Sequence, residues 1–226
     1  MCVLYEYGDD LISWRQSLPY DNMQIIALKT VHDTTISEPE IELVGKSGEL
    51  VALEWRYPDF AECFDFAYLR NKLDDFAEGD WIMHMDSDER LASPHDELWT
   101  YLDTLEKQGA SAAYVSIAGC THHLAKDSET YRERYCEPNM RLHKRTAYLR
   151  WEGICHEVLD IPLSNIVIAD TDILLYHKGY TYGLETMLSK TKRNAELLIR
   201  EYTRQKSERN WNYLISTFSY INQNSR

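Results

Sequence analysis

The sequence lacks the features of membrane-spanning and secreted proteins. None of its apolar runs is long enough to cross a bilayer, and its first residues contain no basic segment followed by an apolar one. Its five cysteines are odd in number and include no Cys-x-x-Cys pair, which favours reduced thiols over a disulfide framework. We therefore expect a cytoplasmic protein with no transmembrane segment.

Positive charge is also scarce. Lys and Arg number 24 against 37 Asp and Glu, which gives a formal net charge of −13. This balance argues against a broad grip on the phosphate backbone of nucleic acid. One stretch is nonetheless basic, and we interpret it as a solvated face or as an edge that faces a diphosphate. Its members are Arg132, Arg134, Arg141, Lys144, Arg145 and Arg150.

The length, the composition and the order of apolar segments predict one α/β domain. The 226 residues, 44% hydrophobic and 27% charged, suffice for one core, and no repeat, low-complexity tract or linker divides them. Apolar runs at 2–5, 23–28 and 50–55 predict strands, and apolar residues at helical spacing over 11–18 predict a helix. A strand, a helix and a strand that follow one another at this spacing along the chain imply a parallel sheet. Residues 29–39 are polar and turn-like.

Further periodic segments predict the rest of the elements. Strands are expected at 112–118, 140–143, 166–169 and 173–177, and helices near 66–76, 94–108, 184–202 and 211–218. Ser93 is expected to cap the second of these helices and Gly109 to end it. Residues 120–138 have no clear period, so we expect a long loop there.

The segment from Gly79 to Leu91 is the one around which the chain is organised. Residues 81–85 form a short apolar run that is typical of a buried strand, with acids at its carboxyl end, where open α/β sheets bind ligands. Asp86 and Asp88 are two residues apart, so both carboxylates can reach one hard cation. Mg²⁺ or Mn²⁺ accepts such oxygens and bridges them to a diphosphate.

An Asp-x-Asp pair is a weak signal by itself. Chance gives about one such pair in a chain of this composition, and the sequence contains a second, Asp170 and Asp172. The second pair precedes its apolar run instead of following it, and we expect it to cap the entry of a strand. Context therefore selects Asp86 and Asp88.

Several motifs that occur in one order resemble those of the family-2 glycosyltransferases of the GT-A fold. The resemblance covers residues 55–202 and is weak before them. The motifs are DFAYLRN at 65–71, GDW at 79–81, DSDER at 86–90, RL at 141–142, GICHE at 153–157, HKGY at 177–180 and KRN at 192–194.

The resemblance implies a fold and an activity. The fold is α/β of GT-A type: a Rossmann-like, mostly parallel central sheet flanked by helices, with C-terminal helices. Residues 1–180 would form the nucleotide-sugar and acceptor domain, and residues 181–226 a helical extension packed on it. The activity is metal-dependent transfer of a sugar, with inversion, from a nucleotide-sugar, above all a UDP-sugar. The acceptor is a glycan, a lipid-linked sugar, a protein or a modified nucleic-acid base.

The resemblance also implies residue roles. Asp88 would bind Mn²⁺ or Mg²⁺, with Asp86 on the metal or the ribose and His177 as a third ligand, because imidazole suits Mn²⁺. Glu157 would be the catalytic base, and His156 would orient it or contact the phosphates. The alternative for Glu157 is a structural salt bridge to an arginine or lysine of the basic stretch, namely Arg141, Lys144 or Arg150.

Three further residues are candidates for donor binding. Arg70 and Asn71 would contact the donor phosphates or sugar, and a buried structural ion pair is the alternative. Asp33 closes the turn that meets the nucleotide base in the family. The family's first Asp of that turn is missing, because Leu28 or Lys29 stands in its place, and Glu6-Tyr7 replaces a Lys-Asn pair. We therefore expect a weakened preference for uridine.

Two rival functions stay open at this point. The altered turn near Lys29 is compatible with a non-catalytic protein that binds sugars or nucleotides. A phosphoryl-transfer enzyme would use an Asp-x-Asp-x-Thr motif, but Arg90 stands where Thr belongs.

Overall fold

The computed structural model describes most of the chain. The described residues are 2–5, 18, 23–38, 40–47, 50–58, 65–122, 131–161, 167–177 and 184–224. The helix predicted at 11–18 lies almost entirely outside them, as do Glu6, Tyr7 and residues 178–180.

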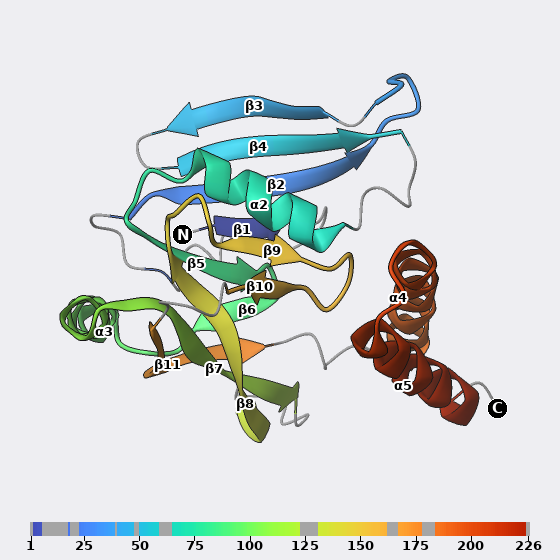
Figure 1. Ribbon diagram of the computed structural model, residues 1–226. Coiled ribbons are helices and arrows are strands. Elements are labelled where there is room, and N and C mark those ends of the chain that lie inside the picture. Colours follow the sequence, from blue (N-terminus) through green and yellow to red (C-terminus); the bar gives the residue numbers. More distant parts are fainter. Residues whose placement is uncertain are drawn as a thin grey trace.

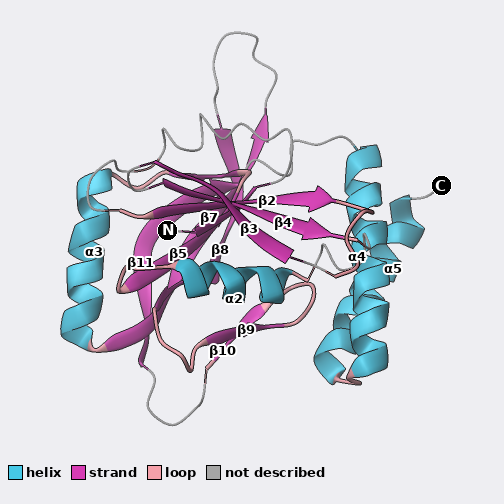
Figure 2. Cartoon of the chain, turned by 90° about the horizontal axis from the view of Figure 1, so that it is seen from above, coloured by secondary structure: helices cyan, strands magenta, loops and turns pink. Residues whose placement is uncertain are grey.

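A mixed sheet crosses the molecule, and helices cover both of its faces (Figures 1 and 2). The strands are β1 Cys2–Tyr5, β2 Ile25–His32, β3 Glu40–Ser47, β4 Leu50–Tyr57, β5 Trp81–Asp86, β6 Glu89–Leu91, β7 Ala110–His122, β8 Tyr131–Lys144, β9 Arg150–Glu152, β10 Val158–Asp160 and β11 Val167–His177. The helices are α2 Phe66–Phe76, α3 His95–Gln108, α4 Leu184–Arg204 and α5 Glu208–Asn224. Within the described residues, nine strands pair in the order β3-β4-β2-β1-β5-β8-β7-β11-β6, and β9 and β10 form a separate ribbon.

The expectation of a mostly parallel sheet is correct for only half of it. β4, β2, β1 and β5 run parallel, as the strand–helix–strand pattern predicted. β8 enters between β5 and β7 and runs antiparallel to both, while β3 and β6 pair antiparallel at the two edges. Antiparallel pairing through β8 therefore joins the two parallel parts, β4-β2-β1-β5 and β7-β11.

Several strand boundaries differ from the predictions for a physical reason. Residues 29–32, expected in a turn, continue β2, and residues 131–138, expected in a loop, belong to β8. Backbone pairing sustains both segments: β2 stays in register with β4 as far as His32, and β8 pairs with β7 as far as Tyr131. β3 was missed because it is an edge strand whose side chains are mostly exposed or half-buried and so show no clear period.

Two local predictions about polar residues are wrong. Ser93 does not cap α3, because its Oγ accepts a hydrogen bond from the Leu174 backbone N–H at 2.8 Å. Asp170 and Asp172 do not cap a strand entry but lie inside β11, where the register shifts against β7. The end of α3 is as predicted: Gly109 adopts a left-handed conformation with φ of 69°.

The alternation of side chains along β5 separates two apolar layers. Ile82 packs in a cluster with Leu69 of α2, whereas Met83 and Met85 pack in the cluster that contains Leu98 of α3. Successive residues of a strand point to opposite faces. The polar residues at 84 and 86 therefore face the same side as Ile82, the side that α2 covers.

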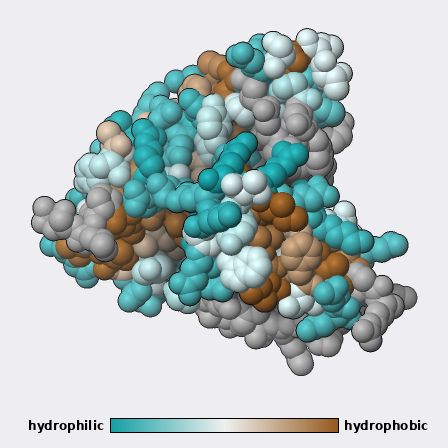
Figure 3. All heavy atoms as spheres, turned by 45° about the vertical axis from the view of Figure 1, so that its right-hand side comes forward, coloured by the Kyte–Doolittle hydropathy of each residue, from teal (hydrophilic) through white to brown (hydrophobic). Residues whose placement is uncertain are grey.

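The two C-terminal helices contribute to the same core. Leu197 and Leu198 of α4 and Leu214 of α5 are buried in the cluster with residues of α2, β2 and β4. Figure 3 shows apolar patches among hydrophilic residues on the face that it turns toward the viewer. The two C-terminal helices also expose apolar side chains. Those exposed side chains include Ile199, Trp211, Ile215 and Phe218. In the described residues, no helix is long and apolar enough to cross a membrane.

Candidate functional site

A cavity of about 900 Å³ opens where β5 and β11 end. Its wall is assembled from several elements: α2, β5 and the turn after it, β7, β8, the β9–β10 hairpin, β11, α4 and α5. This volume lies in the upper part of the range for small-molecule sites. The cavity brings together most of the residues selected from the sequence. Those that line it are Arg70, Asp86, Asp88, His156, Glu157 and His177.

Asp88 and His177 meet because of the pairing of β6 with β11. Asp88 lies in the turn between β5 and β6, and the antiparallel register sets His177 opposite Glu89. The Asp88 Oδ2 and His177 Nε2 atoms are 3.3 Å apart. Burial lowers the pKa of His177, but the hydrogen bond and charge of Asp88 outweigh it, so that the pKa is raised.

The Asp88–His177 pair fits one divalent ion. Two ligands of an ion with bonds of about 2.0–2.2 Å lie about 3 Å apart, which is close to the separation of these two atoms. A carboxylate and an imidazole together suit Mn²⁺. Both side chains border the cavity, so a bound ion would be open to a ligand there.

Asp86 is held by two arginines. Its Oδ1 accepts a hydrogen bond from Arg70 at 3.0 Å, and its Oδ2 accepts one from Arg141 at 2.9 Å. Burial raises the pKa of Asp86, but the charges of Arg141 and Arg70 outweigh it and hold the pKa well below its usual range. Direct metal ligation by Asp86 stays a prediction, and it would require exchange of one of these bonds.

Glu89 is a member of the site that the sequence analysis did not single out. Its side chain is 1% exposed, and it accepts hydrogen bonds from Arg141 at 2.9 Å and from the Asp86 backbone N–H at 2.8 Å. Burial raises its pKa, Arg141 opposes this, and the charge of Asp86 adds to it, which leaves the pKa at about 7. Glu89 therefore fixes both Arg141 and the end of β5. The only sequence signal was its position in the DSDER motif.

Glu157 reaches the same network through Arg70. Its Oε1 accepts a hydrogen bond from Arg70 Nε at 2.6 Å, and the Arg70 side chain is only 2% exposed. The salt bridge proposed as the alternative for Glu157 thus exists, but with a different partner. Lys144 pairs with Glu106 instead, and Arg150 with Asp75. Among the described residues, nothing donates a hydrogen bond to the other oxygen of Glu157, Oε2.

The loop that carries Glu157 is strained and braced. It joins β9 to β10, and Gly153 and His156 adopt positive φ values of 97° and 57°. Arg209 of α5 donates a hydrogen bond to the His156 carbonyl, and the His156 ring stacks on Tyr213 with centroids 4.3 Å apart. Glu201 of α4 accepts a hydrogen bond from the Ile154 backbone N–H at 3.1 Å. The C-terminal helices therefore hold the loop in its shape.

A pair of glycine substitutions tests this bracing. Gly153→Ala and Gly109→Ala both place a side chain on left-handed backbone, and each is expected to lower the free energy of unfolding by roughly 1–2 kcal/mol. A Cβ at Gly153 would lie 3.0 Å from Arg209 Nη2, whereas a Cβ at Gly109 meets nothing within 4 Å. Only Gly153→Ala should therefore displace Arg209 and raise amide hydrogen exchange in residues 153–157. Equal exchange in the two variants would contradict the bracing.

Two predicted donor-binding residues lie apart from the cavity lining. The amide of Asn71 is used by the backbone of Trp151, with hydrogen bonds of 2.9 and 2.8 Å. Asp33 pairs with Arg56 at 3.0 Å and accepts hydrogen bonds from the hydroxyl and the backbone N–H of Thr35. The bond from the Thr35 hydroxyl lowers the pKa of Asp33 most. Their proposed contacts with a donor stay predictions. The basic stretch is no uniform face, since Arg141, Lys144 and Arg150 are each paired with acids.

A second group of potential metal ligands lies outside the lining of the cavity. Asp74, His84 and His143 each offer a ligand atom, and these atoms lie within 4.8 Å of one another. Burial lowers the pKa of His84 to about 3, although Asp74 opposes this. No sequence pattern indicates the group, because its members are separated along the chain and share no motif.

Comparisons with known proteins give distant matches. No protein-family model matches the chain, and no curated protein sequence matches it. In structure it is similar to S. aureus TarS, with a TM-score of 0.45 and 11% identity over 100% of this chain and 48% of that chain. It is similar to S. aureus TarS 1–349 in complex with UDP-GlcNAc, with a TM-score of 0.39, 10% identity and coverage of 99% and 80%. For TarS 1–349 in complex with UDP, the TM-score is 0.38, with 8% identity and coverage of 96% and 70%. The chain spans about half the length of the first of these structures.

Proposed function

We propose that the protein transfers a sugar from a nucleotide-sugar donor to an acceptor, with inversion and with the help of a divalent metal ion. The observation that carries the proposal is that one cavity holds both a carboxylate–imidazole pair, which could bind a metal ion, and a second carboxylate. The pair is Asp88 and His177, and the second carboxylate is Glu157. The motif resemblance of residues 55–202 points to the same chemistry.

The donor diphosphate would lie against the metal side of the cavity. Asp88 and His177 would hold Mn²⁺ or Mg²⁺, which neutralises the charge that develops on a departing diphosphate. Lys190 and Arg193 of α4 line the same cavity and add positive charge to it. Asp86, which is fixed by Arg70 and Arg141, would face the ribose.

The acceptor would meet Glu157. Its Oε2 would take the proton of the acceptor hydroxyl. At the same time, the hydroxyl oxygen would bond to the anomeric carbon of the donor sugar, and the bond from that carbon to the diphosphate would break. Arg70 binds both Glu157 and Asp86, so one buried guanidinium sets the distance between the acceptor side and the donor side. His156 would shape this side through its stacking on Tyr213.

A non-catalytic nucleotide-sugar-binding protein is the second candidate. One observation favours it: Leu28 or Lys29 replaces the family's Asp, and Lys29 pairs with Glu54 at 3.3 Å. The phosphoryl-transfer alternative has less support. Both oxygens of Asp86, its nucleophile, accept hydrogen bonds from arginines, which weakens a carboxylate as a nucleophile.

Thermal unfolding and donor hydrolysis test the proposal together. Sugar nucleotides are added one at a time, with Mn²⁺ or with a chelator, and stabilisation of the folded state reports binding. We expect at least one sugar nucleotide to raise the melting temperature only with Mn²⁺ and then to be hydrolysed slowly. Stabilisation without hydrolysis would favour the binding protein. No stabilisation by any donor would overturn both candidates.

Nucleoside diphosphates, added in the same unfolding assay, test the expected weak preference for the base. Leu28 is fully buried, Lys29 pairs with Glu54, and Asp33 pairs with Arg56, so the turn offers no free acceptor of the expected kind. A site without such a buried acceptor does not penalise the wrong base. The affinities for UDP, GDP, CDP and ADP should therefore agree within about tenfold. Strict uridine selectivity that is lost in Asp33→Asn would contradict this.

A further inference from the structure

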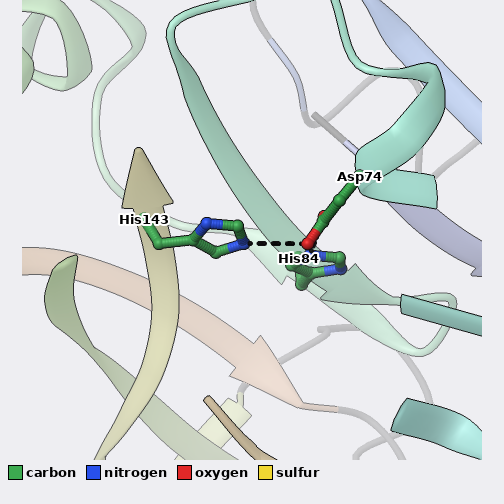
Figure 4. A group of neighbouring side chains, drawn as sticks. All are labelled: Asp74, His84 and His143. Carbon is green, nitrogen blue, oxygen red and sulfur yellow. Dashed lines mark hydrogen bonds and ion pairs between the residues drawn. The ribbon is translucent and has the colours of Figure 1, made fainter. Parts of the chain in front are cut away.

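Asp74, His84 and His143 form a buried cluster on the side of the sheet that α2 covers (Figure 4). Asp74 comes from α2, His84 from β5 and His143 from β8. The three residues are 7%, 1% and 1% exposed, respectively. A carboxylate and two imidazoles in such a place require partners for every polar atom, because an unsatisfied buried group is costly.

One contact in the cluster, among the described residues, joins two buried atoms without a hydrogen-bond partner, His143 Nε2 and Asp74 Oδ2. His143 Nδ1 contacts the Lys144 carbonyl at 2.9 Å, so Nδ1 carries a proton. The lone pair of a neutral His143 is then on Nε2, and Nε2 faces Asp74 Oδ2 at 3.4 Å. In the described residues, neither of these two buried atoms has a hydrogen-bond partner. Two acceptors that face each other in the interior require a cation between them.

The distances favour a metal ion over a proton as that cation. A charge-assisted N–H···O bond is about 2.7–2.9 Å long, whereas 3.4 Å separates His143 Nε2 from Asp74 Oδ2. Two ligands of a tetrahedral ion with bonds of about 2.0–2.1 Å lie about 3.3–3.4 Å apart. The carbonyl that orients His143 through Nδ1 is also the usual outer partner of a metal-binding histidine.

His84 supplies the third ligand atom. Its Nε2 lies 2.8 Å from Asp74 Oδ1, which is a hydrogen-bond distance. Metal binding would move the Nε2 proton to Nδ1, which leaves a neutral imidazole bound through Nε2, and would need an outward shift of about half an ångström. The His84 and His143 rings already stack, with centroids 5.6 Å apart, so both imidazoles approach Asp74 side by side.

We propose that Asp74, His84 and His143 bind one transition-metal ion of the Zn²⁺ class, distinct from the Mn²⁺ or Mg²⁺ proposed in the cavity. Two imidazoles and one carboxylate match the ligands that Zn²⁺ takes, and water completes the tetrahedron. The ion ties α2, β5 and β8 together at one point of the interior. Its role is structural, since the cluster residues are not among those that line the cavity.

The position of the cluster explains what such an ion would hold in place. Each ligand shares an element with an arginine or aspartate of the cavity network and lies on the same face, one helical turn or two strand residues away. Trp151 contacts both the cluster and the cavity network: its ring lies 5.0 Å from the His84 ring and 5.0 Å from the Arg70 guanidinium. The pairs of cluster and network residues are Asp74 with Arg70, His84 with Asp86, and His143 with Arg141.

Metal analysis of the whole chain tests the proposal. Protein prepared without a metal-chelating resin is dialysed, and its zinc is measured by plasma mass spectrometry. We expect about one zinc per chain, a lower melting temperature after removal by a strong chelator, and recovery with Zn²⁺ but not with Mg²⁺. Cobalt substitution should give the intense visible bands of tetrahedral Co²⁺.

Variants assign the ion to this cluster. His143→Gln should lose the zinc, whereas His143→Cys, which restores a ligand, should keep it. The double variant Asp88→Asn with His177→Gln should also keep it, because those residues belong to the cavity. If His143→Gln does not fold, the cobalt spectrum of the unaltered chain and of the cavity double variant decides. Zinc below about a tenth of an equivalent, with no stabilisation by Zn²⁺, would overturn the proposal.

Discussion

Glu157→Gln is expected to reduce sugar transfer by about 10²–10⁴-fold while donor binding and the fold are retained, because the variant loses the group that takes the acceptor's proton. Gln keeps the shape of the side chain and an oxygen that can accept the hydrogen bond from Arg70, which is 2.6 Å long in the unaltered protein. The acidic limb of the pH–rate profile should disappear with the carboxylate. Transfer rates, donor affinity and melting temperature are measured on the one variant.

A matched control separates this role from that of a structural ion pair. Glu106→Gln also breaks a salt bridge, the one to Lys144 at 2.9 Å, but Glu106 is not among the residues that line the cavity. We expect Glu106→Gln to keep its transfer rate. If Glu157→Gln melts at a lower temperature with near-normal transfer, the carboxylate is structural and the assignment of the base is wrong.

The local part of the site was readable from the sequence. The apolar run before Asp86 predicted a buried strand with acids at its carboxyl end, and β5 has this form. Gly109 was correctly expected to end α3. These predictions succeeded because they depend on neighbours along the chain: the period of apolar residues, and a glycine that can adopt positive φ.

The contacts that assemble the site are long-range and carry no local signal. Arg70 and Glu157 are 87 residues apart, and Arg141 and Glu89 are 52 residues apart. The salt-bridge partners expected in the alternative role of Glu157 were therefore wrong, and Glu89 was not singled out. The antiparallel insertion of β8 likewise follows from pairing with β5 and β7, which periodicity within β8 does not encode.

The histidines illustrate the same difference between local signals in the sequence and long-range contacts. His177 ends an apolar segment, which drew attention to it, and the β6–β11 register does bring it to Asp88. His84 lies in the middle of the apolar run of β5 and was treated as part of that run. Its contact with Asp74 depends on a helix packing on the strand, so only the folded structure displays it.

Asp88→Asn is expected to abolish the Mn²⁺-dependent stabilisation by a nucleoside diphosphate and to reduce transfer by about 10²–10³-fold, the scale for loss of one strong electrostatic stabiliser. The fold should tolerate the change. The Asp88–His177 contact is partly exposed, at 19% and 22%, and such pairs contribute at most about 1 kcal/mol. If Asp88→Asn loses the Mn²⁺-dependent stabilisation by a nucleoside diphosphate but unfolds at the same temperature without ligands, the loss reflects the loss of metal binding.

The second Asp-x-Asp pair supplies the control for this prediction. Asp172→Asn also removes the second carboxylate of an Asp-x-Asp pair. Asp172, however, lies in the irregular part of β11 and is not among the residues that line the cavity. We expect it to keep both the Mn²⁺ response and the transfer rate. Calorimetry on both variants with Mn²⁺ and a nucleoside diphosphate makes the comparison direct. Unchanged affinity in Asp88→Asn would remove Asp88 from the metal site, and equal losses in the two variants would mean that the effect is one of overall charge.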